Sequence, residues 1–326
     1  MKKWIATVAA TALLTPLYAA HAADPYPNHS ITWVVPFAAG GPTDAMARNI
    51  ANKVSQALKE TIIVENVPGA GGTIGATKAA RSKADGYTFL VGHVGYMAAA
   101  PSLYEKLSYD PVKDFEAVFR FPDTPLVLLV GDNSPYKSIN ELVDFAKKNP
   151  GGLDFSNAGV GSTSHLVAAM FASKAGIKIE PIAYKGAGPA LNDLMGDQVD
   201  AMFDQTNTAL PQTRGGKVRA LALTSAQRMD QFPNVPTMAE SAVPGFQVST
   251  WYGLYAPKDT PDNVIQTMYK AYQQALQDKA FTQQMSDQGI LLLSDEQYSP
   301  KVFQQYTIDQ GKQWAEVIKQ AGISLK

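Results

Sequence analysis

The sequence predicts an α/β protein with two lobes. Strand-like and helix-like segments alternate along most of the chain, a pattern typical of parallel sheets with helices on both faces. Several short apolar segments end in glycine-containing loops that lead into helices. Two segments, 120–125 and 246–252, are interpreted as crossings of the chain between the lobes. The 326 residues are enough for two medium domains with sizeable cores.

The first expected strand, Ile31–Val35, runs into a loop of small residues and a helix that begins at Pro42. Proline suits a first helical position because its φ is already helical and its missing N–H would have had no partner. Positions 38–41 carry nothing beyond Cβ, so we expect their backbone N–H groups to face a ligand beside the positive helix end. The alternative is an ordinary corner between strand and helix.

Further elements follow in the same alternating order. In the first part we expect a strand at 61–65, a helix at 73–81 and a strand at 87–91. The second part is expected to hold a strand at 125–130, a helix at 138–148, a strand at 153–156, a helix from about 163, and strands at 178–183, 199–203 and 217–224. The tail from 261 is expected to be helical and to pack on lobe 1. Lobe 1 is therefore assigned to 23–123 and 249–326, and lobe 2 to 124–248.

The N-terminus has the pattern of a secretory signal peptide over residues 1–22. Lys2 and Lys3 precede an uncharged apolar run, and Ala20-His21-Ala22 forms a small-x-small cleavage site. The run is too short for a transmembrane span. We expect cleavage after Ala22 and, since the chain has no cysteine for thiol chemistry, a periplasmic protein of a Gram-negative cell.

Composition and motifs exclude several classes of function. Without Lys2 and Lys3 the chain has 26 basic and 29 acidic residues, a net charge of −3, which does not favour nucleic acid as a partner. The segment 69–75 has Ile74 where a dinucleotide fingerprint needs glycine. His29, His93 and His165 lack metal-ligand spacing. We therefore expect no cofactor and no metal.

A second glycine loop, 157–165, follows the expected strand at 153–156. Ser162 or Thr163 is a good N-cap, and His165 falls in the first helical turn, where its imidazole can reach a ligand. The alternative is that these side chains only cap and pack. A hydrolase using Ser162, His165 and Asp204 is a rival interpretation, but no strained elbow exposes this serine.

A third loop, 184–190, carries Lys185, the one cation near these loops. A solvated lysine is the ordinary interpretation, and a ligand contact is the functional one. Asp204 ends the expected strand 199–203 and either anchors the next helix or touches a ligand.

Together these motifs resemble the tripartite tricarboxylate transporter receptors, the periplasmic Bug family of solute-binding proteins. The resemblance covers essentially the whole mature chain and rests on the segments 36–44, 64–75, 84–90, 109–115, 184–190 and 234–237. It implies a type II periplasmic-binding fold whose lobes close over a carboxylate, held mainly by backbone N–H groups and bridging waters without an arginine clamp. Carried onto this sequence, it implies ligand contacts at Phe37, Ala39, Gly40, Gly41, Thr43, Asp44, Ser156, Asn157, Gly161, Ser162, Thr163, His165 and Asp204.

One loop departs from the family pattern. His93, Val94 and Tyr96 stand where small and polar residues are usual. Flat rings at Phe37, His93 and Tyr96 favour a planar ligand, so we expect an aromatic dicarboxylate such as terephthalate. A small aliphatic acid is the alternative if His93 and Tyr96 pack away from the cleft. The loops hold no arginine, which argues against a tricarboxylate such as citrate.

The sequence thus predicts a binding protein and not an enzyme. We expect a monomer that closes like a Venus flytrap about hinges at 121–125 and 248–251 and delivers its ligand to membrane permease subunits. A receptor that only senses the ligand for a signalling partner is the alternative.

Overall fold

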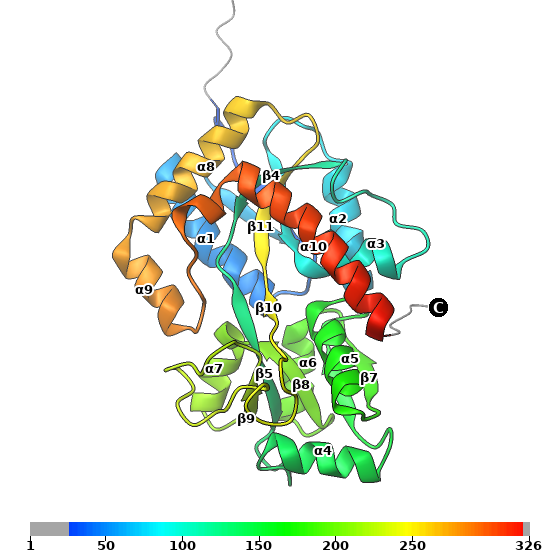
Figure 1. The fold of residues 1–326 in the computed structure, drawn as a ribbon. Coiled ribbons are helices and arrows are strands. Elements are labelled where there is room, and N and C mark those ends of the chain that lie inside the picture. Colours follow the sequence, from blue (N-terminus) through cyan, green and yellow to red (C-terminus); the bar gives the residue numbers. More distant parts are fainter. Residues whose placement is uncertain (1–25, 322–326) are drawn as a thin grey trace, which may run out of the picture.

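The computed structural model describes residues 26–321, so the predicted signal peptide and its cleavage site at Ala22 lie outside the described residues. Two α/β units, each built on one sheet, lie at opposite ends of the molecule, with two extended segments running between them (Figure 1). Within the described range no helix is long and apolar enough to cross a membrane.

The first unit is built on a five-stranded sheet of order β2-β1-β3-β11-β4. Its strands are β1 (Ile31–Val35), β2 (Ile62–Asn66), β3 (Thr88–His93), β4 (Phe115–Arg120) and β11 (Tyr252–Pro257). Its helices are α1 (Pro42–Leu58), α2 (Thr73–Ala80), α3 (Ala100–Leu103), α8 (Asp262–Leu276), α9 (Lys279–Asp287) and α10 (Pro300–Ala321), with a π-helical turn at Gly95–Ala99. Alternation along β1 assigns the faces: Ile31 and Trp33 pack with α1 and α8, and Val34 packs with α2.

The second unit is built on a six-stranded sheet of order β10-β5-β8-β6-β7, with β9 also paired to β5. Its strands are β5 (Thr124–Gly131), β6 (Asp154–Asn157), β7 (Glu180–Ala183), β8 (Ala201–Gln205), β9 (Val218–Leu223) and β10 (Ser249–Thr250). Helices α4 (Ile139–Lys148) and α5 (Thr163–Ala175) cover one face, and α6 (Ala187–Met195) and α7 (Thr206–Arg214) cover the other.

Both sheets are mixed, whereas the sequence predicts parallel ones. β11 runs antiparallel to β3 and β4, and β5 runs antiparallel to β8 and β9. The reason is the crossing of the chain. A strand that arrives from the other unit starts at the edge where the parallel strands of its new sheet end, so it has to run against them. β4 and β11 themselves are not among the predicted strands.

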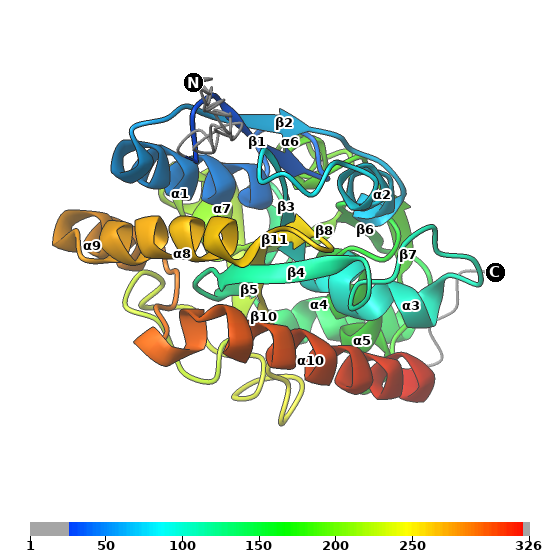
Figure 2. The same ribbon diagram turned by 90° about the horizontal axis from the view of Figure 1, so that it is seen from above.

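Helix α10 fastens both crossings. Residues 121–123 join β4 to β5, and Trp251 joins β10 to β11. The Trp251 Nε1–H donates to Gln310 Oε1 at 3.0 Å, and the Arg120 guanidinium lies 3.6 Å from the ring centre of Tyr306. Figure 2 shows α8 and α10 running along the first unit on either side of β11 and β4. The helical tail therefore packs on the five-stranded sheet.

Candidate anion-binding cleft

Two cavities lie between the units. The helix-end cavity has a volume of about 10 Å³ and is lined by Phe37, Gly41, Pro42, Thr43, His93, Ala158, Ser162, Thr163, Ser164, Ala187 and Gln205. The glycine-loop cavity has a volume of about 200 Å³ and is lined by Phe37, Gly69, Ala70, Gly71, Gly72, Ala158, Gly159, Val160, Ala183, Tyr184 and Lys185. Phe37 and Ala158 border both, so the two cavities are neighbours that share a wall.

Four helices begin at the helix-end cavity. Pro42 and Thr43 open α1, Thr163 opens α5, Ala187 opens α6, and Gln205 is the N-cap of α7. The first turn of a helix has N–H groups without intrahelical partners and carries about half a positive charge. Four such ends at one point make the cavity attractive to an anion.

The first glycine loop uses part of its donors within the protein. The Gly40 N–H donates to Asp44 Oδ2 at 3.0 Å, and the Ala38 N–H donates to the Lys185 carbonyl at 3.2 Å. Burial opposes ionisation of Asp44, but hydrogen bonds from Arg48, Gly40 and Asn66 hold the pKa of its carboxyl below the usual value. Asp44 thus fastens the loop to its own helix.

Of the predicted ligand contacts in this loop, some line a cavity and others do not. Phe37, Gly41 and Thr43 line the helix-end cavity. Ala39 and Gly40 are exposed to solvent, and Asp44 does not line either cavity.

His93 and Thr163 join the two units across the helix-end cavity. The Gly95 N–H donates to His93 Nδ1 at 3.0 Å, so the ring hydrogen is on Nε2. Nε2 then donates to Thr163 Oγ1, 2.9 Å away. Complete burial lowers the pKa of His93 to about 3, which keeps the imidazole neutral. His93 therefore faces the cleft as a neutral donor, already engaged by the opposite unit.

Tyr96 lies behind this pair. Its hydroxyl donates to the Val91 carbonyl, and its ring centre is 5.5 Å from that of His93 and 5.9 Å from that of Phe37. It is fully buried and lines neither cavity. Its role is to support the two rings that do reach the cleft.

The second glycine loop is organised by neutral side chains. Asn157 Oδ1 accepts from the Gly159 N–H at 3.0 Å, and His165 Nδ1 accepts from the Gly161 N–H at 3.3 Å. Ser162 caps α5 by accepting from the His165 N–H at 3.4 Å. Ser162 lines the helix-end cavity, whereas Asn157, Gly161 and His165 shape the loop without lining it.

Two further predicted residues, Ser156 and Lys185, do not line the helix-end cavity. The hydroxyl of Ser156 donates to the Ala190 carbonyl at 3.5 Å beneath the sheet. Lys185 lies on the glycine-loop cavity and not on the helix-end cavity.

The hydrogen bonds of Ser162 do not support the hydrolase interpretation. Its hydroxyl contacts the Ser164 hydroxyl at 3.1 Å and accepts from the His165 backbone N–H, so these bonds are not those of a serine activated by an imidazole.

Buried polar groups without partners gather at the deep end of the cleft. Asp204 is fully buried, accepts from the Thr208 hydroxyl at 2.6 Å, and has its pKa raised to about 7 by burial. Oxygen atoms without a hydrogen bond in this region belong to Thr124, Asp204, Gln205, Asn207 and Tyr252. Unpaired buried polar atoms are costly, and this group lies where the two crossings meet the sheets.

Gln205 and Tyr252 are residues that the sequence reasoning missed. Gln205 lines the helix-end cavity, and the Tyr252 hydroxyl faces Thr43 from the start of β11. Gln205 has a sequence signal: it follows Asp204 at a strand end and precedes a helix, as in the other three corners. Tyr252 has none, because its strand comes from the other unit.

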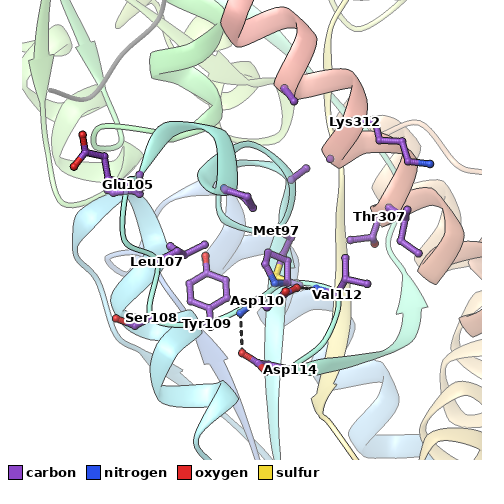
Figure 3. Close-up of a pocket in the computed structure, with 17 residues that line it drawn as sticks. Met97, Glu105, Leu107, Ser108, Tyr109, Asp110, Val112, Asp114, Thr307 and Lys312 are labelled. Atoms are coloured by element: carbon purple, nitrogen blue, oxygen red, sulfur yellow. Dashed lines mark hydrogen bonds between the residues drawn. The ribbon is translucent and has the colours of Figure 1, made fainter.

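Larger hollows lie on the outside of the first unit. One, of about 810 Å³, is bounded by the segment 97–114 and by α10 (Figure 3). Asp114 on its wall accepts from the Asp110 N–H at 2.7 Å. Another, of about 860 Å³, is bounded by β4, α8 and α10. Neither lies between the sheets, and none of the predicted site residues lines either of them.

The sequence is similar to a known family and to a protein of Bordetella pertussis. The model of the tripartite tricarboxylate transporter family receptor matches residues 46–323. Protein BugT of Bordetella pertussis is 36% identical over 305 residues, which cover 93% of this chain and 93% of BugT.

Solved structures resemble the chain over most of its length. The periplasmic binding protein BugD is 43% identical with a TM-score of 0.88, over 91% of this chain and 99% of BugD. MatC of Rhodopseudomonas palustris with bound malate is 36% identical with a TM-score of 0.86, over 90% of this chain and all of MatC. A second R. palustris protein, solved with adipate, is 32% identical with a TM-score of 0.87, over 92% of this chain and all of that protein.

Proposed function

Because this chain belongs to the tripartite tricarboxylate transporter family of receptors, we propose that it captures a dicarboxylate between its two units. As a member of this family, it is a periplasmic solute-binding receptor. We further propose that it delivers the dicarboxylate to the membrane permease subunits of such a transporter.

The meeting of four helix N-termini at one cavity carries the proposal. Among the described residues that line this cavity, none has a charged side chain. Backbone N–H groups, the hydroxyls of Thr43, Ser162 and Thr163, and helix ends would therefore hold the carboxylate. Asp204 lies close by, and its raised pKa reduces the negative charge that a carboxylate ligand would meet.

The two units would have to part to admit the ligand. A cavity of about 10 Å³ has room for roughly one water molecule. Hydrogen bonds from Ala38 to Lys185, from His93 to Thr163, and from Asn207 Nδ2 to the Pro42 carbonyl close the cleft. We propose that hinges at 121–125 and 248–251 open it, with lobe 1 at 23–123 and 249–326 and lobe 2 at 124–248.

Terephthalate is the narrower proposal. Relatives of this chain were solved with malate and adipate, which are aliphatic diacids. Phe37 supports a planar ligand, because its ring forms part of the wall of both cavities and an aromatic contact is worth about 0.5–1.5 kcal/mol. Tyr96 gives no such support, since its ring packs behind Phe37 and His93.

A thermal shift measurement tests the carboxylate site. At about 100 times its dissociation constant, a ligand stabilises the folded protein by roughly 2.7 kcal/mol. We expect this effect from a dicarboxylic acid and not from its dimethyl ester. Equal stabilisation by acid and ester would contradict an anion site made of N–H groups.

Calorimetric titration identifies the ligand. The series is terephthalate, benzoate, adipate, malate and citrate, and the proposal expects terephthalate to bind most tightly and citrate least. Tighter binding of adipate or malate would remove the aromatic proposal and keep the dicarboxylate receptor. Uptake of the bound acid by cells with and without the permease subunits separates delivery from sensing.

A further inference from the structure

We infer that Lys185 and the backbone of residues 69–72 form a second anion subsite, which selects dicarboxylates over monocarboxylates. This inference rests on the proposed function and adds where the second carboxylate of the ligand would lie.

The glycine-loop cavity has the size and the wall for such a subsite. Its volume of about 200 Å³ is far larger than the roughly 10–15 Å³ that a single water molecule needs. Three loops surround it: 69–72 from the first unit, and 158–160 and 183–185 from the second. Among the described residues of this wall, Lys185 is the one with a charged side chain.

The charge of Lys185 is not neutralised by the protein. Some lysines of the chain are paired, among them Lys53 with Asp278, Lys78 with Glu65 and Lys258 with Glu116, whereas Lys185 is exposed and belongs to those that are not. Within residues 26–321, no carboxylate lies within ion-pair distance of the Lys185 ammonium. A cation without a partner, at the wall of a cavity between two binding lobes, is suited to an anionic group of the ligand.

Closure fixes the backbone that carries this lysine. The Lys185 carbonyl accepts from the Ala38 N–H of the first unit at 3.2 Å. A Cβ on Gly186 would lie 3.0 Å from the same Ala38 nitrogen, so the two loops are already in close contact. The position of Lys185 relative to the first unit is therefore defined when the cleft is closed.

The opposite wall depends on glycine. Gly71 has φ +61°, and a Cβ there would lie 2.1 Å from the Val160 carbonyl oxygen. Only glycine allows the loop 69–72 to approach the second unit this closely. The Gly72 N–H donates to the Gly69 carbonyl at 3.0 Å and the Thr73 N–H donates to the Ala70 carbonyl, which leaves the N–H groups of Ala70 and Gly71 for an anion.

The two cavities together define a ligand with charge at both ends. They share Phe37 and Ala158 as a wall, so one carboxylate at the four helix ends leaves the rest of the ligand directed past Phe37. A second carboxylate then reaches Lys185, whereas a monocarboxylate leaves Lys185 solvated. The lysine therefore adds affinity only for diacids.

Variants at Lys185 test the inference with matched ligand pairs, terephthalate with benzoate and adipate with hexanoate. For K185M we expect the affinity for the diacids to fall about five- to tenfold and that for the monoacids to change less than twofold. K185R should keep the preference for diacids. K217M is the control, because Lys217 is exposed and lines neither cavity.

The salt dependence gives a second readout. Diacid binding by the unsubstituted protein should weaken with ionic strength more than diacid binding by K185M. An unchanged ratio of diacid to monoacid affinity in K185M would overturn the inference and leave the receptor proposal standing. If neither acid of a pair binds the unsubstituted protein, the proposed function fails and this inference with it.

Discussion

The loops 36–44 and 157–165 share a sequence pattern, a strand followed by glycines and a helix start, but they use their polar groups differently. In the first loop a charged side chain, Asp44, takes the Gly40 N–H and ties the loop to its own helix. In the second loop, neutral hydroxyl and amide groups organise the turn, and Thr163 bonds across the cleft to His93. The comparison teaches that the pattern locates a helix end but does not say which donors are free for a ligand.

Removing the bond across the cleft should have the largest effect. Thr163→Val keeps the shape of the side chain and leaves the buried Nε2–H of His93 without an acceptor. The cost is about 1–3 kcal/mol, and it should appear as a ligand affinity about 10- to 100-fold lower in calorimetry. Thr213→Val is the control, since its hydroxyl bonds to the Ala209 carbonyl within one helix. Unchanged affinity in the Thr163 variant would show that this contact does not contribute to closure.

The pH dependence of stability should separate the two buried titratable groups of the cleft. Folding lowers the pKa of His93 to about 3, so this group costs stability as the pH falls below about 6.5. Folding raises the pKa of Asp204 to about 7, so this group adds stability as the pH falls below 7. The two effects oppose each other between about pH 4 and 6.5.

Asp204→Asn should remove the opposing contribution of Asp204, so that the loss of stability caused by His93 at low pH becomes visible. Each pKa unit corresponds to about 1.4 kcal/mol, so we expect the variant to lose roughly 2 kcal/mol more than the unsubstituted protein between pH 7.5 and 5. Urea unfolding at the two pH values measures the difference. Parallel pH profiles of the two proteins would contradict a carboxyl group that is protonated in the fold.

Asp44→Asn should weaken the fold more than it weakens binding. The variant loses charge-assisted hydrogen bonds from Arg48 and Gly40, which we expect to cost about 1–2 kcal/mol in the free energy of unfolding. Because the pKa of Asp44 is lowered, its contribution is fully present above about pH 4 and is lost below it, as the pH falls through the lowered pKa of the folded protein. Ligand affinity should change less than about threefold, since Asp44 lines neither cavity. A larger loss of affinity at unchanged stability would place Asp44 against the ligand.

The smallest effects distinguish the two glycines of the first loop. Gly40 has φ +82°, so Gly40→Ala should cost about 1 kcal/mol in stability. Gly41 has φ −85°, and a Cβ there would meet the second unit at an ordinary 3.5 Å, so Gly41→Ala should be nearly neutral. Thermal unfolding of both variants tests this, and equal destabilisation would mean that backbone conformation is not what requires Gly40.

The sequence predicted what local patterns determine. The strand Ile31–Val35, the helix at Pro42 and the helix at Thr163 follow from apolar spacing, proline and capping residues, and all three are present. It did not predict the antiparallel pairing of β5 and β11, because pairing across a chain crossing depends on distant segments. The loops that carry the polar residues of the site were predicted, but the hydrogen-bond partner of each side chain was not.

Tyr96 and Gln205 illustrate that limit. Tyr96 follows the cleft residue His93 by three positions in the sequence, yet its side chain lies in the core. It packs against Phe37 and His93, and its hydroxyl donates to the Val91 carbonyl. Gln205 reaches the helix-end cavity because β8 ends there. The burial of Tyr96 is not contained in the spacing of neighbouring residues, whereas Gln205 stands between a strand and a helix, a pattern that the sequence does contain.

Backbone amide NMR tests the central claim, that a carboxylate lies at four converging helix ends, most directly. On saturation with the dicarboxylate that binds, we expect the largest amide proton shifts at Thr43, Thr163, Ala187 and Thr206, each in the first turn of its helix. Saturable binding with the largest shifts instead around Met97, Ile308 and Lys312, in the outer hollow of the first unit, would contradict the account.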